Sequence, residues 1–370
     1  MAKRIFDLPQ TKGEFKARGL ITGTGKDKFY KEGSTPSKKD QNGKEIGLKA
    51  KRNLKFGIKV AGDGSTVYCD VQAKEQDNVY FYKKGNKKLN IKGESKAVNF
   101  GTRELFKEEG FEPIGIKVGI EQEFDEKGAL KNINIPMFEF DSAKYLSENL
   151  TEDQAVFVRG KIEFSSYING NTGDKVRMQK FIPTQVSGVT VDINLDDEKY
   201  VSSNDFIQTI IFMGIELDDN KDDKKGILSA KVVNYSTIED VEFIVRDQKL
   251  FKTLKKNLKP YNAIRIFGKI NNKLEQVVED DGWGTSNNTF ETKAGNFTRE
   301  LLVLGANPET LDKETYTNAK VDEAIKLIRA NQKAKEEFGE KTIESSTDDW
   351  GTSNKKASQQ DEEEFEEGWG

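Results

Sequence analysis

An eight-residue stretch occurs twice in closely similar form, and it limits the folds open to this chain. Ala155–Ile162 reads AVFVRGKI and Ala263–Ile270 reads AIRIFGKI, with Ala, Gly, Lys and Ile at the same four positions. Both stretches alternate along a half-buried strand, and a glycine in mid-strand permits the strong coiling that small closed barrels need. We expect them to be the same strand of two similar domains; a chance match of two amphipathic strands is the alternative.

Short alternating strands extend this pattern over most of the chain. Asn53–Val60 and Ser65–Gln72 flank the turn sequence AGDG, which predicts a hairpin, and Ala155–Phe164 with Lys175–Ile182 predicts a second one. The pattern restarts near residue 200 with strands over Phe206–Leu217, Ile227–Tyr235, Asp240–Arg246 and Ala263–Ile270, and a helix over Gln248–Asn257. A helix before the penultimate of five or six short strands describes the OB-fold, a Greek-key barrel.

The predicted fold class is therefore mainly β, with two OB-fold-like Greek-key barrels, a C-terminal helix and a disordered acidic tail. An apolar content of 35% is too low for one large core and favours several small units. The expected divisions are a first barrel with long inserted loops over 1–195, a second barrel over 196–312, a helix over 313–338 and the tail over 339–370. Val321, Ala324, Ile325 and Ile328 share one face of that helix and predict packing against the second barrel.

The residue types present exclude most catalytic chemistry. The chain has no histidine and one cysteine, so zinc sites and Cys–His nucleophiles are excluded. It has no phosphate-binding Gly-Lys-Ser/Thr loop, and the acidic stretch Glu216–Asp223 lacks calcium-loop spacing. We expect that the protein is not an enzyme and that it binds no cofactor, metal or small-molecule substrate. The sequence has no run of eighteen apolar residues, so no membrane span is predicted. We therefore expect a cytoplasmic protein, in a bacterial host cell if the chain is phage-encoded.

The charge is divided unevenly along the sequence. Residues 336–370 hold twelve Asp and Glu against three Lys, a net charge of −9, which leaves +5 for residues 1–335 of the overall −4. A mildly basic body thus carries a strongly acidic tail, and a basic groove on the body would attract that tail electrostatically.

Strand alternation in the first domain places aromatic rings and cations together on the faces opposite the core. Bases stack on flat rings, while Lys and Arg follow phosphates without reading sequence, so this mixture suits single-stranded DNA. The alternative is a set of ordinary solvated sheet faces. The expected DNA-binding residues are Lys55, Lys59, Tyr68, Phe157, Arg159, Lys161, Lys175, Arg177 and Phe181, with Arg265, Phe267 and Lys269 in the second domain.

A denser basic–aromatic stretch begins with Tyr80, Phe81 and Tyr82. From Lys83 to Lys96 there are six Lys and one Glu. Three adjacent aromatics cannot all enter a core from one strand, so at least one faces outward. We add Tyr80, Tyr82, Lys83 and Lys84 to the expected DNA-binding set; one buried ring beside a solvated charge run is the alternative.

The acidic tail ends in DEEEFEEGWG, where carboxylates surround two aromatic rings. The three tryptophans lie in related segments, WGTSN at 283–287 and again at 350–354, and GWG at 368–370. Carboxylates steer a segment toward a basic surface, and exposed rings anchor it there. The expected partner-binding residues are Asp361, Glu362, Glu363, Glu364, Phe365, Glu366, Glu367 and Trp369. A solubilising tail without a partner is the alternative.

Barrel-like strands at 53–72, 155–182 and 263–270, followed by this tail, resemble replicative single-stranded DNA-binding proteins, particularly those of bacteriophages. The resemblance implies coating and protection of unwound DNA, and recruitment of a polymerase, helicase or primase through the tail. The Trp-Gly ending departs from the Pro-Phe ending of the bacterial proteins, which leaves the tail's partner open. Two other functions remain: a recombination mediator or strand-annealing protein, and a non-DNA interaction or virion-assembly protein.

Overall fold

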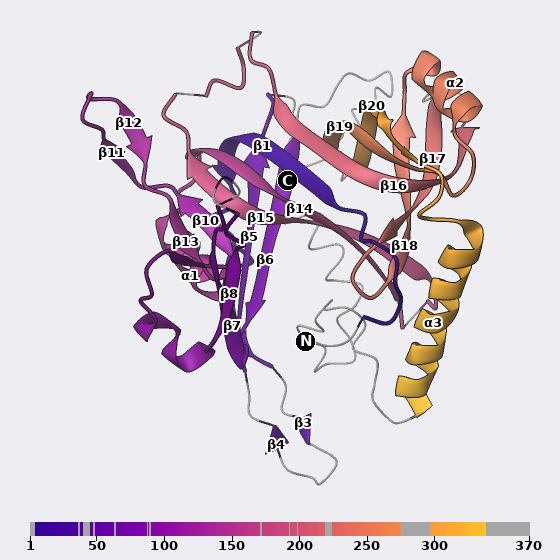
Figure 1. Ribbon diagram of the computed structural model, residues 1–370. Helices are drawn as coiled ribbons and strands as arrows, with labels where there is room; N and C mark the ends of the chain where they lie inside the picture. The colour runs from indigo at the N-terminus through magenta and orange to yellow at the C-terminus, as the bar shows by residue number, and fades with distance from the viewer. Residues whose placement is uncertain are drawn as a thin grey trace.

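Two closed barrels of five strands each form the centre of this mainly β structure, a computed structural model (Figure 1). It describes residues 4–35, 38–39, 45–46, 49–62, 64–86, 88, 90–170, 172–191, 193–197, 199–218, 224–274 and 297–337. Among these residues no helix is long and apolar enough to cross a membrane.

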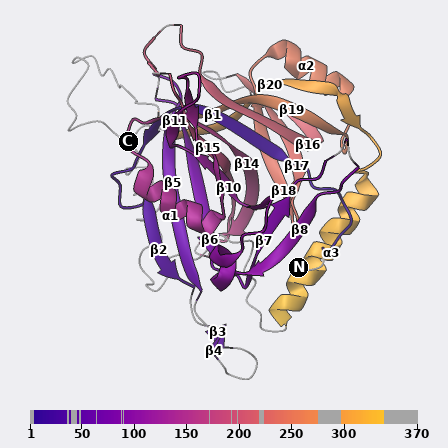
Figure 2. The ribbon, with the colours of Figure 1, turned by 60° about the vertical axis from the view of Figure 1, so that its left-hand side comes forward.

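The first barrel has the strand order and the helix position of an OB-fold. Its strands are β1 (Gly13–Thr22), β5 (Ala50–Lys59), β6 (Thr66–Lys74), β14 (Ala155–Ile168) and β15 (Lys175–Gly188). Antiparallel pairs join β1 to β5, β5 to β6 and β15 to β14; β6 and β15 run parallel, and β14 closes the ring on β1. Helix α1 (Glu139–Asn149) precedes β14 and lies across β5 and β6 (Figure 2).

The second barrel repeats this order strand for strand. Its elements are β16 (Ser203–Asp218), β17 (Lys225–Val233), β18 (Ile238–Val245), α2 (Gln248–Asn257), β19 (Ala263–Leu274) and β20 (Phe297–Asp312). The parallel pair is β18–β20, and β19 closes the ring on β16. The prediction of two OB-fold-like barrels is confirmed by this pairing, while the exact division of the chain into domains stays a prediction.

The two barrels are joined through their first strands. One edge of β1 pairs with β14, and the other edge pairs first with β16 and then with β5. β16 is used in the same way by β19, β1 and β17. The order β15-β14-β1-β16-β19-β20 is therefore one continuous sheet that runs from barrel to barrel, and the two halves are related by an approximate twofold axis at the β1–β16 pair.

The repeated eight-residue stretch occupies matching places in the two barrels, as the sequence predicted. Gly160 lies opposite Phe15 in the β14–β1 pair, and Gly268 lies opposite Phe206 in the β19–β16 pair. A Cβ on Gly160 would lie 2.4 Å from the Phe15 ring, and one on Gly268 would lie 3.0 Å from the Phe206 ring. Each glycine thus makes room for the central ring of its barrel.

Long insertions surround the first barrel. β2 (Tyr30–Ser34) pairs with β5, and β3 (Lys38–Lys39) pairs with β4 (Glu45–Ile46) in the same connection. Between β6 and β14 lie a three-stranded sheet of β7 (Asn78–Lys83), β8 (Glu94–Asn99) and β9 (Phe111–Pro113), the 3₁₀ turn η2 (Phe100–Leu105), the barrel-edge strands β10 (Ile116–Gly119) and β13 (Ile135–Met137), and the hairpin β11 (Gln122–Phe124)–β12 (Leu130–Asn132).

The last helix, α3 (Asn318–Glu337), packs on the second barrel as predicted (Figure 2). Val321 and Ala324 are buried against Ile211 and Val233 of that barrel. Phe6 and Leu8, from the segment before β1, complete this cluster. The N-terminal segment and the last helix therefore share one apolar seam on the second barrel.

Candidate nucleic-acid interface

The continuous sheet presents one outward surface that crosses from the first barrel to the second. We call it the bridging face. Residues directly opposite in adjacent antiparallel strands project from the same side of a sheet. Two rows cross four strands in this way, one of Lys161, Glu14, Ile207 and Phe267, and one of Arg159, Lys16, Asp205 and Lys269. Phe157 with Arg18 and Ser203, and Thr209 with Arg265, extend the bridging face at its two ends.

Cations outnumber anions on the bridging face. Glu14 and Asp205 are its acids, and each is paired: Arg159 Nη2 lies 2.6 Å from a Glu14 oxygen, and Lys269 Nζ lies 2.8 Å from an Asp205 oxygen. The remaining cations, Lys16, Arg18, Lys161 and Arg265, make no ion pair with any residue that the structure describes. A surface with uncompensated cations along several strands attracts a polyanion.

An exposed aromatic ring lies at the second-barrel end of the bridging face. Phe267 is 43% exposed, and its neighbour Ile207 is 44% exposed. The Phe267 ring lies over Gly305 of β20, where a Cβ would come within 2.4 Å of ring atom Cζ. The ring is thus held against backbone on one side, while the other side is open to a flat partner such as a nucleobase.

A second cationic surface is formed by β5, β6 and β15 of the first barrel. Lys55, Lys59 and Tyr68 lie on it, all half-buried, and Tyr68 is directly opposite Gly57. Lys180 of β15 donates to Gln72 at 3.1 Å. Two acids moderate the charge, because Lys55 is opposite Asp70 and Lys59 Nζ lies 3.5 Å from Asp153.

The second barrel reaches over to this surface. β19 contacts β6, and burial raises the pKa of the Tyr68 phenol, with the Thr66 hydrogen bond and the charge of Arg299 in β20 opposing that rise. Burial also raises the pKa of Asp70, against the attraction of Lys55 and Lys180. The surface that carries Tyr68 is therefore partly enclosed by the β19–β20 hairpin.

The matching surface of the second barrel carries two acids of β18, one of them paired with Lys231 of β17 at 2.5 Å, and the first barrel reaches it in the same way. Asp240 and Glu242 project from β18; Lys175 Nζ lies 3.9 Å from Asp240, and Arg177 pairs with Glu242. Ser166 of β14 donates to Glu239 at 2.6 Å. The β14–β15 hairpin thus brings Lys175 and Arg177 to the second barrel, away from Tyr68 and Lys55.

Phe181 was predicted to be an exposed DNA-binding ring, and this is wrong. It is 3% exposed and meets Phe15 edge-on, with 5.2 Å between ring centroids. The pairing shows why: Phe181 is opposite Ile162 and Arg177 is opposite Ser166, on the side of β14 that faces the interior. Lys175 and Arg177 share that side and are exposed because they lie beyond the end of the barrel.

The inserted three-stranded sheet carries Tyr80, Tyr82 and Lys83 on β7, and Lys84 directly follows that strand. Phe81 is buried between them, while Tyr82 is 44% exposed, as the expectation of one outward ring required. Tyr82 lies against Gly93, and Lys83 Nζ lies 5.6 Å from the centroid of the Phe111 ring. These residues form a separate basic–aromatic patch rather than an extension of the bridging face.

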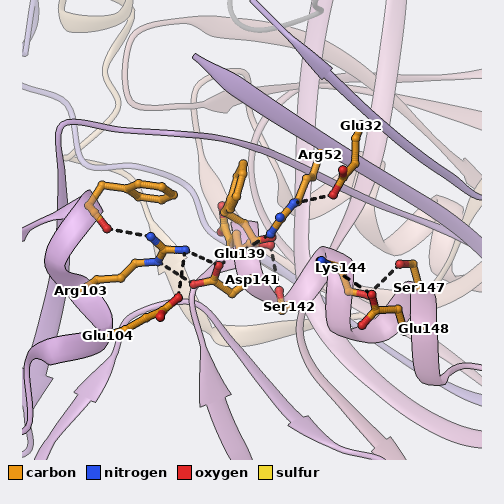
Figure 3. Close-up of polar contacts among 12 residues, drawn as sticks. Glu32, Arg52, Arg103, Glu104, Glu139, Asp141, Ser142, Lys144, Ser147 and Glu148 are labelled. Atoms are coloured by element: carbon orange, nitrogen blue, oxygen red, sulfur yellow. Dashed lines mark hydrogen bonds and ion pairs between the residues drawn. The ribbon is translucent and has the colours of Figure 1, made fainter. Parts of the chain in front are cut away.

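A salt-bridge network connects this inserted sheet to α1 (Figure 3). The guanidinium of Arg103 donates to both carboxylate oxygens of Asp141, at 2.9 and 2.7 Å. Arg52 of β5 donates to Glu32 at 3.0 Å and lies 4.0 Å from the centroid of the Phe140 ring. Together these contacts fix the insert against the helix and the barrel.

Lys16 and Arg18 are central to the bridging face and were missed from the sequence. The signal is present in β1, where Phe15, Ala17, Gly19 and Ile21 are buried and the residues that alternate with them are not. Alternation along a strand over these residues places Lys16 and Arg18 on its outer side. The expected partner-binding tail, 361–370, and both WGTSN segments lie outside the described residues.

Comparison with known proteins gives one sequence family and a distant structural likeness. The model of a family described as YorF matches residues 85–341. No curated protein matches the chain in sequence. In the described part of the chain, no group of three or more His, Cys, Asp or Glu side chains is placed to hold a metal ion.

The similar solved structures include two of the single-stranded DNA binding protein from Thermus aquaticus. The wild-type structure is 8% identical with a TM-score of 0.37, and the match covers 81% of this chain and 93% of that one. A deletion mutant is 10% identical with a TM-score of 0.36, covering 80% and 94%. TM-scores this low do not establish a shared fold, so the barrel assignment rests on strand order and pairing.

Proposed function

The chain belongs to the YorF family, and we propose that it binds single-stranded DNA without sequence specificity, as a non-catalytic protein of DNA replication. The observation that carries this proposal is the bridging face, where Lys16, Arg18, Lys161 and Arg265 lie on one sheet that spans two OB-type barrels. OB-folds bind oligonucleotides, and unpaired strands require cations for phosphates and rings for bases.

The chemistry of the bridging face favours an unpaired strand over a duplex. Phe267 and Phe157 lie at opposite ends of the bridging face, and both are accessible at least in part. A base inside a duplex stacks on its neighbours and cannot stack on these rings, whereas an unpaired base can. Cations without a carboxylate partner, such as Lys161, bind phosphate without first breaking an ion pair. This combination supports binding that is sensitive to salt and indifferent to sequence.

The β5–β6 surface supplies a second segment of the proposed path. OB-folds use the outer face of their second and third strands for oligonucleotides. Lys55, Lys59 and Tyr68 lie on those strands of the first barrel, while the second barrel has Asp240 and Glu242 there, and its Lys231 is paired with Asp240. We therefore assign DNA binding on these strands to the first barrel alone, with the bridging face extending it to the second.

The acidic tail, residues 339–370, completes the proposal as a recruiting segment. Its net negative charge attracts it to the cationic surfaces of the same chain, where it competes with DNA and is released when DNA binds. Phe365 and Trp369 then anchor a replication protein such as a polymerase, helicase or primase. Deleting residues 361–370 should maintain or tighten DNA affinity and abolish partner binding; weaker DNA binding contradicts the competition.

Fluorescence titration with oligo-dT, a duplex and an RNA of equal length, each at several salt concentrations, tests the function. We expect the tightest binding to oligo-dT and a linear fall of log affinity with log salt. Replacing Lys16 and Lys161 by Ala should reduce the slope by roughly 0.7 for each phosphate that the variant no longer neutralises. Lys252→Ala on α2, an exposed cation that is not part of the bridging face, is the matched control. Absence of oligo-dT binding at low salt refutes the proposal.

A further inference from the structure

An open groove of about 380 Å³ adjoins the first-barrel end of the bridging face. Its lining includes Arg18 of β1, Lys131 and Asn132 of β12, Phe157 of β14, and the two residues Asn134 and Thr190. The volume lies within the range of roughly 300–1,000 Å³ that is typical of small-molecule sites. Neither the family match nor the OB topology assigns a ligand to this place.

The groove combines an aromatic ring with an uncompensated guanidinium. Phe157 and Arg18 are directly opposite each other in the β14–β1 pair, so they project from the same side of the sheet. Nε of Arg18 is buried and has no hydrogen-bond partner among the described residues. The guanidinium also makes no ion pair with any of them. A guanidinium that lines a groove and forms no ion pair with the described residues can pair with a phosphate group there.

Hydrogen bonds hold the far wall of the groove in place. Asn132 Nδ2 donates to the Gly188 carbonyl at 2.7 Å, and its Oδ1 accepts from Gln122 at 2.9 Å. The β11–β12 hairpin is thereby connected to the end of β15. Just after β12, the side-chain amide of Asn134 donates to the Asn132 carbonyl at 3.3 Å. A wall fixed in this way needs little rearrangement when a ligand enters, which lowers the cost of binding.

We propose that this groove is a nucleotide subsite, which takes one base of the bound strand against Phe157 and its phosphate against Arg18 and Lys131. The proposal rests on the proposed function and assigns one fixed position along the DNA path. A ring for the base and two cations for the phosphate are the two elements that bind a single nucleotide of an unpaired strand. The amide and hydroxyl groups of Asn134 and Thr190 lie at the same groove and match the polar edges of a base.

The test compares two strands of equal length, oligo-dT and a strand of abasic residues with the same phosphates. Wild-type protein should prefer oligo-dT. Phe157→Ala should reduce the ratio of the two affinities by about 5- to 150-fold, the equivalent of roughly 1–3 kcal/mol of stacking on one ring. Arg18→Gln should weaken the binding of both strands equally and reduce the slope of log affinity against log salt. Phe124→Ala removes an exposed ring of the same β11–β12 hairpin that does not line the groove, and it should change neither quantity.

Crosslinking of wild-type protein avoids any folding defect of a variant. A strand carrying 5-iodouracil should crosslink on irradiation to the peptide that contains Phe157 or to the one that contains Lys131, as read by mass spectrometry. If oligo-dT binds with normal salt dependence but neither peptide is labelled and Phe157→Leu keeps the full preference for bases, the subsite is refuted and the proposed function stands. If neither strand binds at low salt, both the subsite proposal and the proposed function are refuted.

Discussion

Phe15 and Phe206 lie directly opposite each other in the β1–β16 pair, each at the centre of its own barrel core. Each ring is also opposite a glycine of the fourth strand, Gly160 for Phe15 and Gly268 for Phe206. The approximate twofold axis passes between the two rings. One chain therefore has the arrangement of a symmetric dimer of barrels, with the two halves free to diverge in surface charge.

The glycine opposite Phe15 should not tolerate a side chain. A Cβ on Gly160 would lie 2.1 Å from the Ile182 carbonyl oxygen and 2.4 Å from the Phe15 ring, so backbone and core would have to move. We expect Gly160→Ala to lower the free energy of unfolding by about 1–3 kcal/mol, measured by urea denaturation. Gly170→Ala, at the tip of the same hairpin with nothing within 4 Å, should change it little. Equal stabilities of the two variants would contradict the packing described.

The ion pair between Arg177 and Glu242 should matter for DNA binding more than for stability. Both side chains are 50% exposed, and such pairs contribute less than about 1 kcal/mol. Glu242→Gln frees the guanidinium for phosphate, so we expect oligo-dT affinity to rise and the salt slope to steepen by roughly 0.7. Glu216→Gln, an exposed carboxylate of β16, is the control. Unchanged affinity would place Arg177 outside the DNA path.

Asp70 should make stability fall as pH rises. Burial raises its pKa above the ordinary value of 3.8, so the folded protein binds this proton more tightly than the unfolded chain does. Its contribution to stability is therefore lost progressively as pH rises from 3.8 through the raised pKa. Asp70→Asn should raise the melting temperature at pH 7, and the gain should vanish below pH 3.8, where both states of the wild type are protonated.

Thermal scans of wild type and Asp70→Asn across this pH range provide the measurement. Asp174→Asn, in the exposed turn of the β14–β15 hairpin, controls for the general loss of one negative charge. A variant that is less stable than wild type at pH 7 would mean that attraction to Lys55 and Lys180 exceeds the cost of burial.

The bidentate contact between Arg103 and Asp141 should hold the inserted sheet on the barrel. Arg103 is 13% exposed in its side chain and also lies 3.9 Å from the centroid of the Phe100 ring. We expect Arg103→Gln to lower the free energy of unfolding by about 1.5–3 kcal/mol. Arg103→Lys should lower it almost as much, because an ammonium group cannot donate two parallel hydrogen bonds to one carboxylate. Hydrogen exchange should increase in β7 to β9 and not in the second barrel. Lys107→Gln, an exposed neighbour, is the control.

The fold could be predicted closely from the sequence because its signals are local. Alternation in β5, β6, β14 and β19 and the helical pattern in α2 are each visible within about a dozen residues. The repeated AVFVRGKI and AIRIFGKI stretches related the two halves to each other through local pattern alone. β1 was overlooked although its alternation is regular, and with it Lys16 and Arg18 of the bridging face.

The candidate site was predicted less well, because exposure depends on what lies against a face. Alternation placed Lys175, Arg177 and Phe181 on one side of β15, and they are on one side. The barrel encloses that side at Phe181 and ends before Arg177, and no local pattern reports where a barrel ends. Tyr68 is likewise on an outer side, which the β19–β20 hairpin of the other barrel partly encloses.

By itself, the sequence determined the residue chemistry, the strand alternation and the duplication, since each of these is a property of neighbours along the chain. Only the tertiary structure decided that β1 pairs with β16, and so that Lys161, Glu14, Ile207 and Phe267 form one row. That pairing joins residues nearly two hundred positions apart, and it depends on backbone hydrogen bonds between strand edges that carry no side-chain signature.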